Sequence, residues 1–196
     1  RPREREAATK WLAKHFDHVI VDEIFLPVFA GETSRIPARD NVIGLSGLSK
    51  TLGLSSLRVG WIQAPPKILR ACDQIGFNTY CDVPTLPLVA ASLVLPRWNE
   101  IVGGHRARVD ANREALREFD SKFPAVLSHD FSIGHFGVMK VPRRHSSGAS
   151  FAKALRKFSV KVCPCEPFDM PDAVRISAWL EPAKFRTALQ AISKFY

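Results

Sequence analysis

The residues best suited to chemistry lie between Gly47 and Gly60, where a single lysine stands among small, hydroxyl and apolar residues. The run reads Gly-Leu-Ser-Lys-Thr-Leu-Gly-Leu, and Arg58 follows Lys50 by eight residues. Neighbours of this kind are expected to shield the lysine from water, which disfavours its ammonium form, and a neutral amine can form a Schiff base with a carbonyl. The hydroxyl of Ser49 and the guanidinium of Arg58 suit a phosphate. A basic loop between two buried strands is the alternative interpretation.

A second candidate group is a carboxylate that follows the first strongly apolar run. Residues 18–25 read His-Val-Ile-Val-Asp-Glu-Ile-Phe, and continuous β-branched residues predict a parallel strand that is covered on both faces. Asp22 then stands at the carboxyl end of this strand, where open α/β sheets bind ligands. The alternative role for Asp22 is that of a turn or helix cap.

Arg175 is the third candidate. It enters a short apolar strand predicted at 173–179. Only arginine offers a planar fork that meets a carboxylate with two parallel hydrogen bonds. The alternative is a strand-edge arginine in solvent.

These three runs resemble the signature of fold-type I pyridoxal-phosphate (PLP) enzymes, the class I/II aminotransferases. The resemblance rests on the lysine run, on Asp-Glu-Ile-Phe at 22–25 and on Arg-Ile-Ser at 175–177. It implies that Lys50 holds the cofactor PLP as the internal aldimine and acts as the catalytic base, while Asp22 pairs with the pyridine nitrogen. It also implies that Ser49 and Arg58 bind the phosphate of PLP. The carboxylate of the substrate is then assigned to Arg175, and no metal is expected.

Three positions depart from the family pattern. Phe25 replaces a tyrosine that contacts the ring oxygen, Gly47 replaces a frequent second phosphate-binding serine, and Ser56 stands where the family prefers glycine, alanine, asparagine or arginine. The resemblance also covers only the later half of the family's fold, without its Gly/Ser-rich phosphate loop, its ring-stacking aromatic residue or its Asn-Pro turn. We therefore expect these 196 residues to be part of a longer protein and to be inactive alone. A degenerate form is the alternative.

The resemblance implies an α/β, PLP-transferase-like fold in three parts. These are the C-terminal part of a large mixed-sheet domain at 1–97, a long linking helix at 98–123 and a small α/β domain at 124–196. The hydrophobic periodicity and the positions of proline and glycine agree with this fold. They predict a β-turn-β segment at 41–63 and strands at 125–128, 135–141 and 159–163. They also predict a helix at 3–16, whose apolar face is formed by Ala7, Trp11, Leu12 and Phe16.

Composition narrows the class of protein. Hydrophobic residues make up 46% and charged residues 24%, which is typical of a globular protein, and no apolar run is long enough to span a membrane. The net charge of +9 is spread along the chain without aromatic residues interleaved, so we do not expect nucleic-acid binding. The four cysteines lack zinc-site spacing and are read as reduced thiols in a cytoplasmic protein.

The resemblance further implies amino-acid and 2-oxo-acid substrates and a homodimer. Transamination, decarboxylation, elimination and cyclisation share such a site, so these residues leave the reaction and the particular amino acid open. Two other interpretations remain open at this level. One is a ligand-sensing or regulatory module with the same fold, and the other is a non-catalytic remnant.

Overall fold

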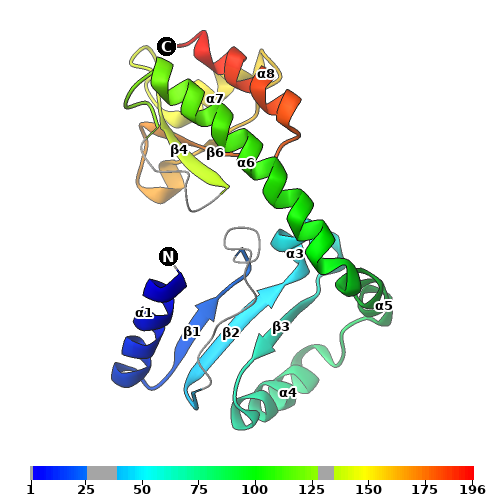
Figure 1. The fold of residues 1–196 in the computed structure, drawn as a ribbon. Coiled ribbons are helices and arrows are strands. Elements are labelled where there is room, and N and C mark those ends of the chain that lie inside the picture. Colours follow the sequence, from blue (N-terminus) through cyan, green and yellow to red (C-terminus); the bar gives the residue numbers. More distant parts are fainter. Residues whose placement is uncertain (1, 26–38, 128–134) are drawn as a thin grey trace. The chain divides into compact units, whose positions relative to one another are not determined.

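The computed structural model describes residues 2–25, 39–127 and 135–196. Contacts divide the chain into two units, Arg1–Gly104 and His105–Tyr196 (Figure 1). The division falls inside one long helix, α6 (Trp98–Lys122), which confirms the continuous helix predicted at 98–123. Among the described residues no helix is both long enough and apolar enough to cross a membrane.

The first unit is built on a small mixed sheet. Strands β1 (Val19–Asp22) and β2 (Val42–Gly47) are parallel, and β3 (Gly60–Gln63) returns antiparallel to β2. This confirms the predicted parallel strand and the predicted β-turn-β segment. The remaining elements of this unit are α1 (Pro2–His15), α3 (Leu48–Thr51), η1 (Ser55–Leu57), α4 (Pro66–Tyr80), α5 (Thr85–Val94) and η2 (Leu95–Arg97).

Burial in this unit does not simply follow the apolar residues of the sequence. Two members of the apolar face predicted for the helix at 3–16, Trp11 on α1 and Phe16 just after it, are 57% and 55% exposed, and the buried residue of α1 among those described is Thr9. Strand β1 was expected to be covered on both faces, but Ile20 is 65% exposed. Residue types predict which side chains need a cover, whereas the cover itself must come from other segments.

The second unit is a three-stranded antiparallel sheet with helices. The sheet order is β4-β6-β5, so β6 (Ala173–Ser177) is central between β4 (Phe136–Lys140) and β5 (Cys163–Pro164). Helices α7 (Gly148–Arg156) and α8 (Pro182–Ser193) and the short η3 (Glu166–Phe168) complete the unit with the later part of α6.

Two predicted strands of the second unit differ from the structure. Leu127 forms only an isolated bridge with Met139, and residue 128 lies outside the described residues. The strand expected at 159–163 is reduced to β5. Its first residues close helix α7 instead, because the amides of Ser159 and Val160 donate to the carbonyls of Arg156 and Leu155 at 3.0 and 3.2 Å. Such backbone bonds satisfy the last carbonyls of a helix.

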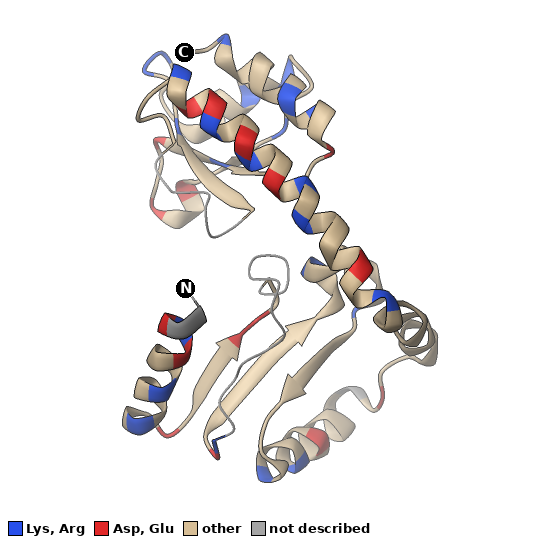
Figure 2. Ribbon diagram, in the orientation of Figure 1, with Lys and Arg blue, Asp and Glu red and all other residues tan. Residues whose placement is uncertain are grey.

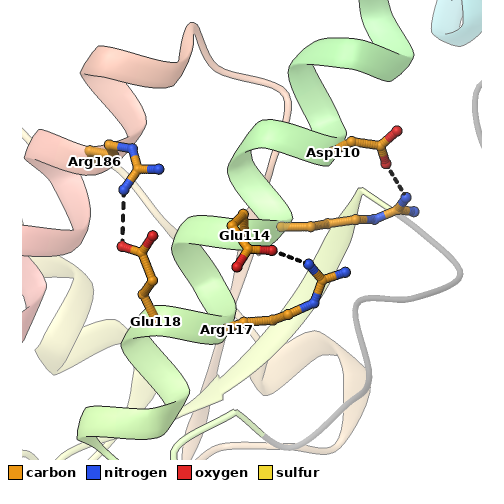
Figure 3. A network of polar contacts seen from close by, with 6 residues as sticks. Asp110, Glu114, Arg117, Glu118 and Arg186 are labelled. Carbon is orange, nitrogen blue, oxygen red and sulfur yellow. Dashed lines mark hydrogen bonds and ion pairs between the residues drawn. The ribbon is translucent and has the colours of Figure 1, made fainter.

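Helix α6 is fixed in the second unit by its buried face and not by its charges. Asn112 is fully buried, and its amide donates to the carbonyls of Ala178 and Leu180 at 3.0 and 2.7 Å. The exposed face carries ion pairs along the helix and one, Glu118 with Arg186, to α8 (Figure 3). Acidic and basic residues alternate along it (Figure 2). Exposed pairs contribute about 0–1 kcal/mol each, so the buried contacts dominate.

Gly148 provides a direct test of the packing at the start of α7. A Cβ atom there would lie 2.4 Å from the carbonyl oxygen of Ala173 and 3.1 Å from a carboxylate oxygen of Glu166. We expect Gly148→Ala to lower the free energy of unfolding by about 2 kcal/mol or more, because backbone must move to admit the methyl group. The matched control is Gly103→Ala, where nothing lies within 4 Å, and it should stabilise by about 0.5–1 kcal/mol through helix propensity. Urea unfolding of both variants measures this, and equal effects would contradict the packing described.

Candidate functional site

The lysine turn begins directly at the end of β2 and is anchored by its apolar residues. Leu48 and Leu52 are 0% and 5% exposed, and they form a core cluster with buried residues of α5 and α6. Between them Lys50 is exposed. Buried residues on both sides of Lys50 therefore hold the short helix α3 in the core while the lysine itself is exposed.

Gly47 explains one of the departures from the family pattern. A Cβ atom at this position would lie 2.9 Å from the carbonyl oxygen of Val59 and 3.1 Å from the Cα of Gly60. The amide of Leu48 donates to that same Val59 carbonyl at 3.1 Å, so the two backbone segments are bonded at their closest approach. A serine could not enter here without displacing β3, and the glycine is required by packing.

Asp22 lies at the same edge of the sheet as the lysine turn. It is the last residue of β1 and pairs in parallel register with Leu45, five residues before Lys50. Its carboxylate is exposed, and Oδ1 accepts a hydrogen bond from the amide of Ile24 at 2.9 Å. This Asx turn is the capping role considered from the sequence. A carboxylate has further lone pairs, so the turn orients the group while leaving it able to accept other hydrogen bonds.

The neighbouring acid has a different environment. Glu23 is 4% exposed, and its Oε1 lies 2.5 Å from a guanidinium nitrogen of Arg5 on α1. Its amide also donates to the carbonyl of Leu45 at 2.7 Å. Glu23 therefore ties α1 to the end of β1, and of the two adjacent acids only Asp22 is presented to a ligand.

Thr51 joins the two turns and was given no role by the sequence reasoning. Its side chain is fully buried, and Oγ1 donates to the carbonyl of Ile24 at 2.8 Å. Ile24 is the residue whose amide binds Asp22, so a single peptide segment links the Asp22 turn to the residue next to Lys50. The available signal was a hydroxyl residue directly after the lysine in an otherwise apolar run.

The remaining residues of the lysine run lie on the connection between β2 and β3. Ser49 is half-buried within α3, and Arg58 is exposed with φ of 55° just after η1. One guanidinium nitrogen of Arg58 donates to the carbonyl of Ser55 at 3.2 Å, which leaves other donors of its fork available. The predicted shielding of Lys50 is wrong for the described chain, because Lys50 is exposed.

Arg175 lies in the second unit on the central strand β6. Its guanidinium carbon is 4.8 Å from the ring centroid of Phe136 and 5.6 Å from that of Phe168. The alternative of a strand-edge arginine is therefore wrong. Two aromatic rings hold the guanidinium, and stacking on a ring face leaves the in-plane N–H groups free to bind an anion.

The groups placed by the first unit fit PLP. An exposed amine and an exposed carboxylate follow neighbouring parallel strands, and a hydroxyl and a guanidinium come from the same connection. An aldehyde, a pyridine nitrogen and a phosphate need these four kinds of partner.

Comparison with known proteins identifies relatives of the whole chain. A sequence model of the family "Aminotransferase class I and II" matches residues 3–192. Histidinol-phosphate aminotransferase 1 of Bradyrhizobium diazoefficiens is 29% identical over 181 residues, which cover 88% of this chain and 49% of that protein. Capreomycidine synthase of Streptomyces vinaceus is 24% identical over 79% of this chain and 40% of that protein. The chain thus spans less than half the length of these relatives.

Solved structures agree on the fold. An aminotransferase from Mycobacterium tuberculosis has a TM-score of 0.83 at 22% identity and covers 98% of this chain and 52% of its own. A mutant aspartate aminotransferase of Thermus thermophilus has a TM-score of 0.81 at 18% identity over 97% of this chain and 54% of its own. The predicted α/β PLP-transferase-like fold is confirmed.

The link through Thr51 can be tested by its stability. Thr51→Val keeps the shape of the buried side chain but leaves the carbonyl of the half-buried Ile24 without its donor, so we expect the free energy of unfolding to fall by about 1–3 kcal/mol. Thr187→Val is the matched control, because that hydroxyl donates to the Ala183 carbonyl at 3.0 Å on an exposed helix face, and its effect should stay within about 0.5 kcal/mol. Chemical denaturation compares them, and a neutral Thr51→Val would disprove the link.

Proposed function

Because the chain belongs to the family of class I and II aminotransferases, we propose that it carries the lysine-bearing part of a PLP-dependent aminotransferase. The cofactor of this family is PLP. The observation that carries the proposal is the position of Lys50 and Asp22 after neighbouring parallel strands, joined through Thr51 and Ile24. The activity and the substrates are proposed for the whole protein, because this chain spans only about half the length of its relatives.

Lys50 is proposed to act at the aldehyde of PLP, and Asp22 at its ring nitrogen. When bound, PLP supplies an aldehyde that joins amines and a ring that accepts electrons from a carbanion. With PLP bound, Lys50 would be the residue that holds its aldehyde, and its amine would move the proton at the substrate α-carbon as general base. Asp22, whose carboxylate has lone pairs left beside the Ile24 amide, would hold the ring nitrogen in its protonated form.

Ser49, Arg58 and Arg175 are proposed to bind anions. The hydroxyl of Ser49 and the unused donors of Arg58 bind the phosphate. Arg175, stacked between two rings, binds the substrate carboxylate with its planar fork.

The substrate class follows from the family and not from one relative. The names of two relatives contain different compounds, histidinol phosphate and capreomycidine. We therefore propose an amino acid and a 2-oxo acid as substrates. A cytoplasmic location stays a prediction from the cysteine usage.

We also propose a homodimer through the helices α4 and α5. Large apolar side chains are exposed there, with Phe77 at 71%, Leu86 at 79% and Leu93 at 72%. Large exposed apolar side chains on neighbouring elements are typical of interaction sites. Symmetric dimers are the commonest assemblies of soluble proteins.

The cofactor assignment predicts covalent trapping of PLP. After incubation with PLP and reduction by borohydride, peptide mapping should find the pyridoxyl mass on Lys50, and Lys50→Ala should remove it. Lys67→Ala, an exposed lysine on α4, is the matched control and should leave the labelling unchanged. Pyridoxyl spread evenly over exposed lysines, with none favoured at Lys50, would overturn the assignment.

The dimer predicts a change in mass after a charge is placed on α5. Leu93→Glu should shift the sedimentation coefficient from dimer to monomer, because a buried unpaired carboxylate is costly. Lys153→Glu, an exposed change on α7, should leave the dimer intact. A monomeric wild type at micromolar concentration would refute this interface.

A further inference from the structure

A hollow of about 310 Å³ lies beside Arg175 in the second unit. It opens where the short ladder of β5 ends, since β5 pairs only Cys163 with Arg175 and Pro164 with Val174. Beyond that point Val162 and Ile176 line the hollow. Its other apolar lining comes largely from the linker after α7 and from α8 and includes Val160, Leu180, Phe185, Leu189 and Ile192.

Among the described residues that line this hollow the charge has one sign. Lys161 and Arg175 are among them, and none of them is an aspartate or a glutamate. Ser177 adds one half-buried hydroxyl. Arg175 has aromatic rings as its partners, and no carboxylate of the described residues pairs with it. Two cations beside a mostly apolar wall are complementary to a ligand that has one anionic end and one apolar end.

We propose that this hollow binds a small monocarboxylic acid with an apolar group about the size of a phenyl ring or a branched alkyl chain. The carboxylate meets the fork of Arg175 and the ammonium of Lys161. The apolar group lies against Val162, Ile176 and Leu180. The inference rests on the proposed function only in that Arg175 is its carboxylate-binding residue, and it adds the chemical class of the side chain that this residue selects.

The lining also determines which acids are rejected. A dicarboxylate would place its second charge against aliphatic side chains, where an unpaired charge is costly to desolvate. A neutral amide would lose the charge-assisted hydrogen bonds to Arg175, which are about twice as strong as neutral ones. The hollow should therefore favour an aryl or branched aliphatic monocarboxylate over both.

Cys163 allows binding to be read directly. It is exposed and lines the hollow, whereas Cys165 is buried, and burial raises the pKa of the Cys165 thiol. Alkylation by iodoacetamide, followed by peptide mapping, should therefore report on Cys163. The exposed Cys81 of the first unit serves as the reference in the same sample.

The experiment uses 3-phenylpropanoate as the probe, without PLP. We expect it to slow alkylation of Cys163 but not of Cys81, and we expect 3-phenylpropanamide and glutarate to bind about tenfold more weakly or worse. Equal protection by the amide or by glutarate would overturn the proposal. Tighter protection by phenyl phosphate would also overturn it, because the hollow would then be a phosphate site.

Variants assign the contacts. Arg175→Gln and Lys161→Gln should each weaken 3-phenylpropanoate binding, about tenfold for Arg175→Gln, whereas Arg156→Gln and Lys157→Gln, which lie outside the hollow, should not. If Arg175→Gln does not fold, the proposal is tested by Lys161→Gln and by comparing 3-phenylpropanoate with 3-phenylpropanamide on the wild type. Unchanged affinity in Lys161→Gln together with equal binding of the amide would exclude this site.

The two proposals fail separately. Binding is measured without PLP and should persist in Lys50→Ala. Trapping of PLP on Lys50 without acid binding would overturn this inference alone. Acid binding without trapping on Lys50 would overturn the cofactor assignment and leave this inference standing.

Discussion

The close approach of β2 and β3 at Gly47 is the constraint on which the candidate site depends. The Leu48 amide is bonded to Val59 there, and Leu48 and Leu52 are buried in the core, so the turn between them has one conformation. Lys50 is the exposed residue of that turn. An amine can be presented reproducibly only when its neighbours are fixed, and the packed leucines provide that frame.

At Asp22 and Arg175, too, neighbouring groups fix the position of a charged side chain. Asp22 is oriented by the Ile24 amide, which belongs to the segment that Thr51 holds. Arg175 is held on a central strand by Phe136 and Phe168. In both cases the supporting contacts leave part of the charged group's hydrogen-bonding capacity unused. This spare capacity distinguishes Asp22 from Glu23, whose carboxylate is buried against Arg5.

Several large apolar residues of the first unit are exposed in this chain, which spans about half the length of its relatives. Ile20 on β1 and Trp11 on α1 are more than half exposed, and so are Phe77, Leu86 and Leu93 on α4 and α5. The sequence pattern correctly marked these residues as apolar, but the described chain does not cover them. In the second unit the apolar residues of β6 and α8 are instead well buried, with Val174 at 0% and Ile192 at 2%.

The sequence by itself determined the family, the α/β fold class and the order of the elements, because these follow from local residue types at fixed spacing. It also marked Lys50, Asp22 and Arg175, whose roles stay predictions. Only the tertiary structure decided what depends on distant contacts. These are the exposure of Lys50, the bond from Thr51 to Ile24, the loss of the strand at 159–163 to the end of α7, and the rings around Arg175. Each depends on segments that are separated in the sequence or on competition for the same backbone groups, which no local pattern records.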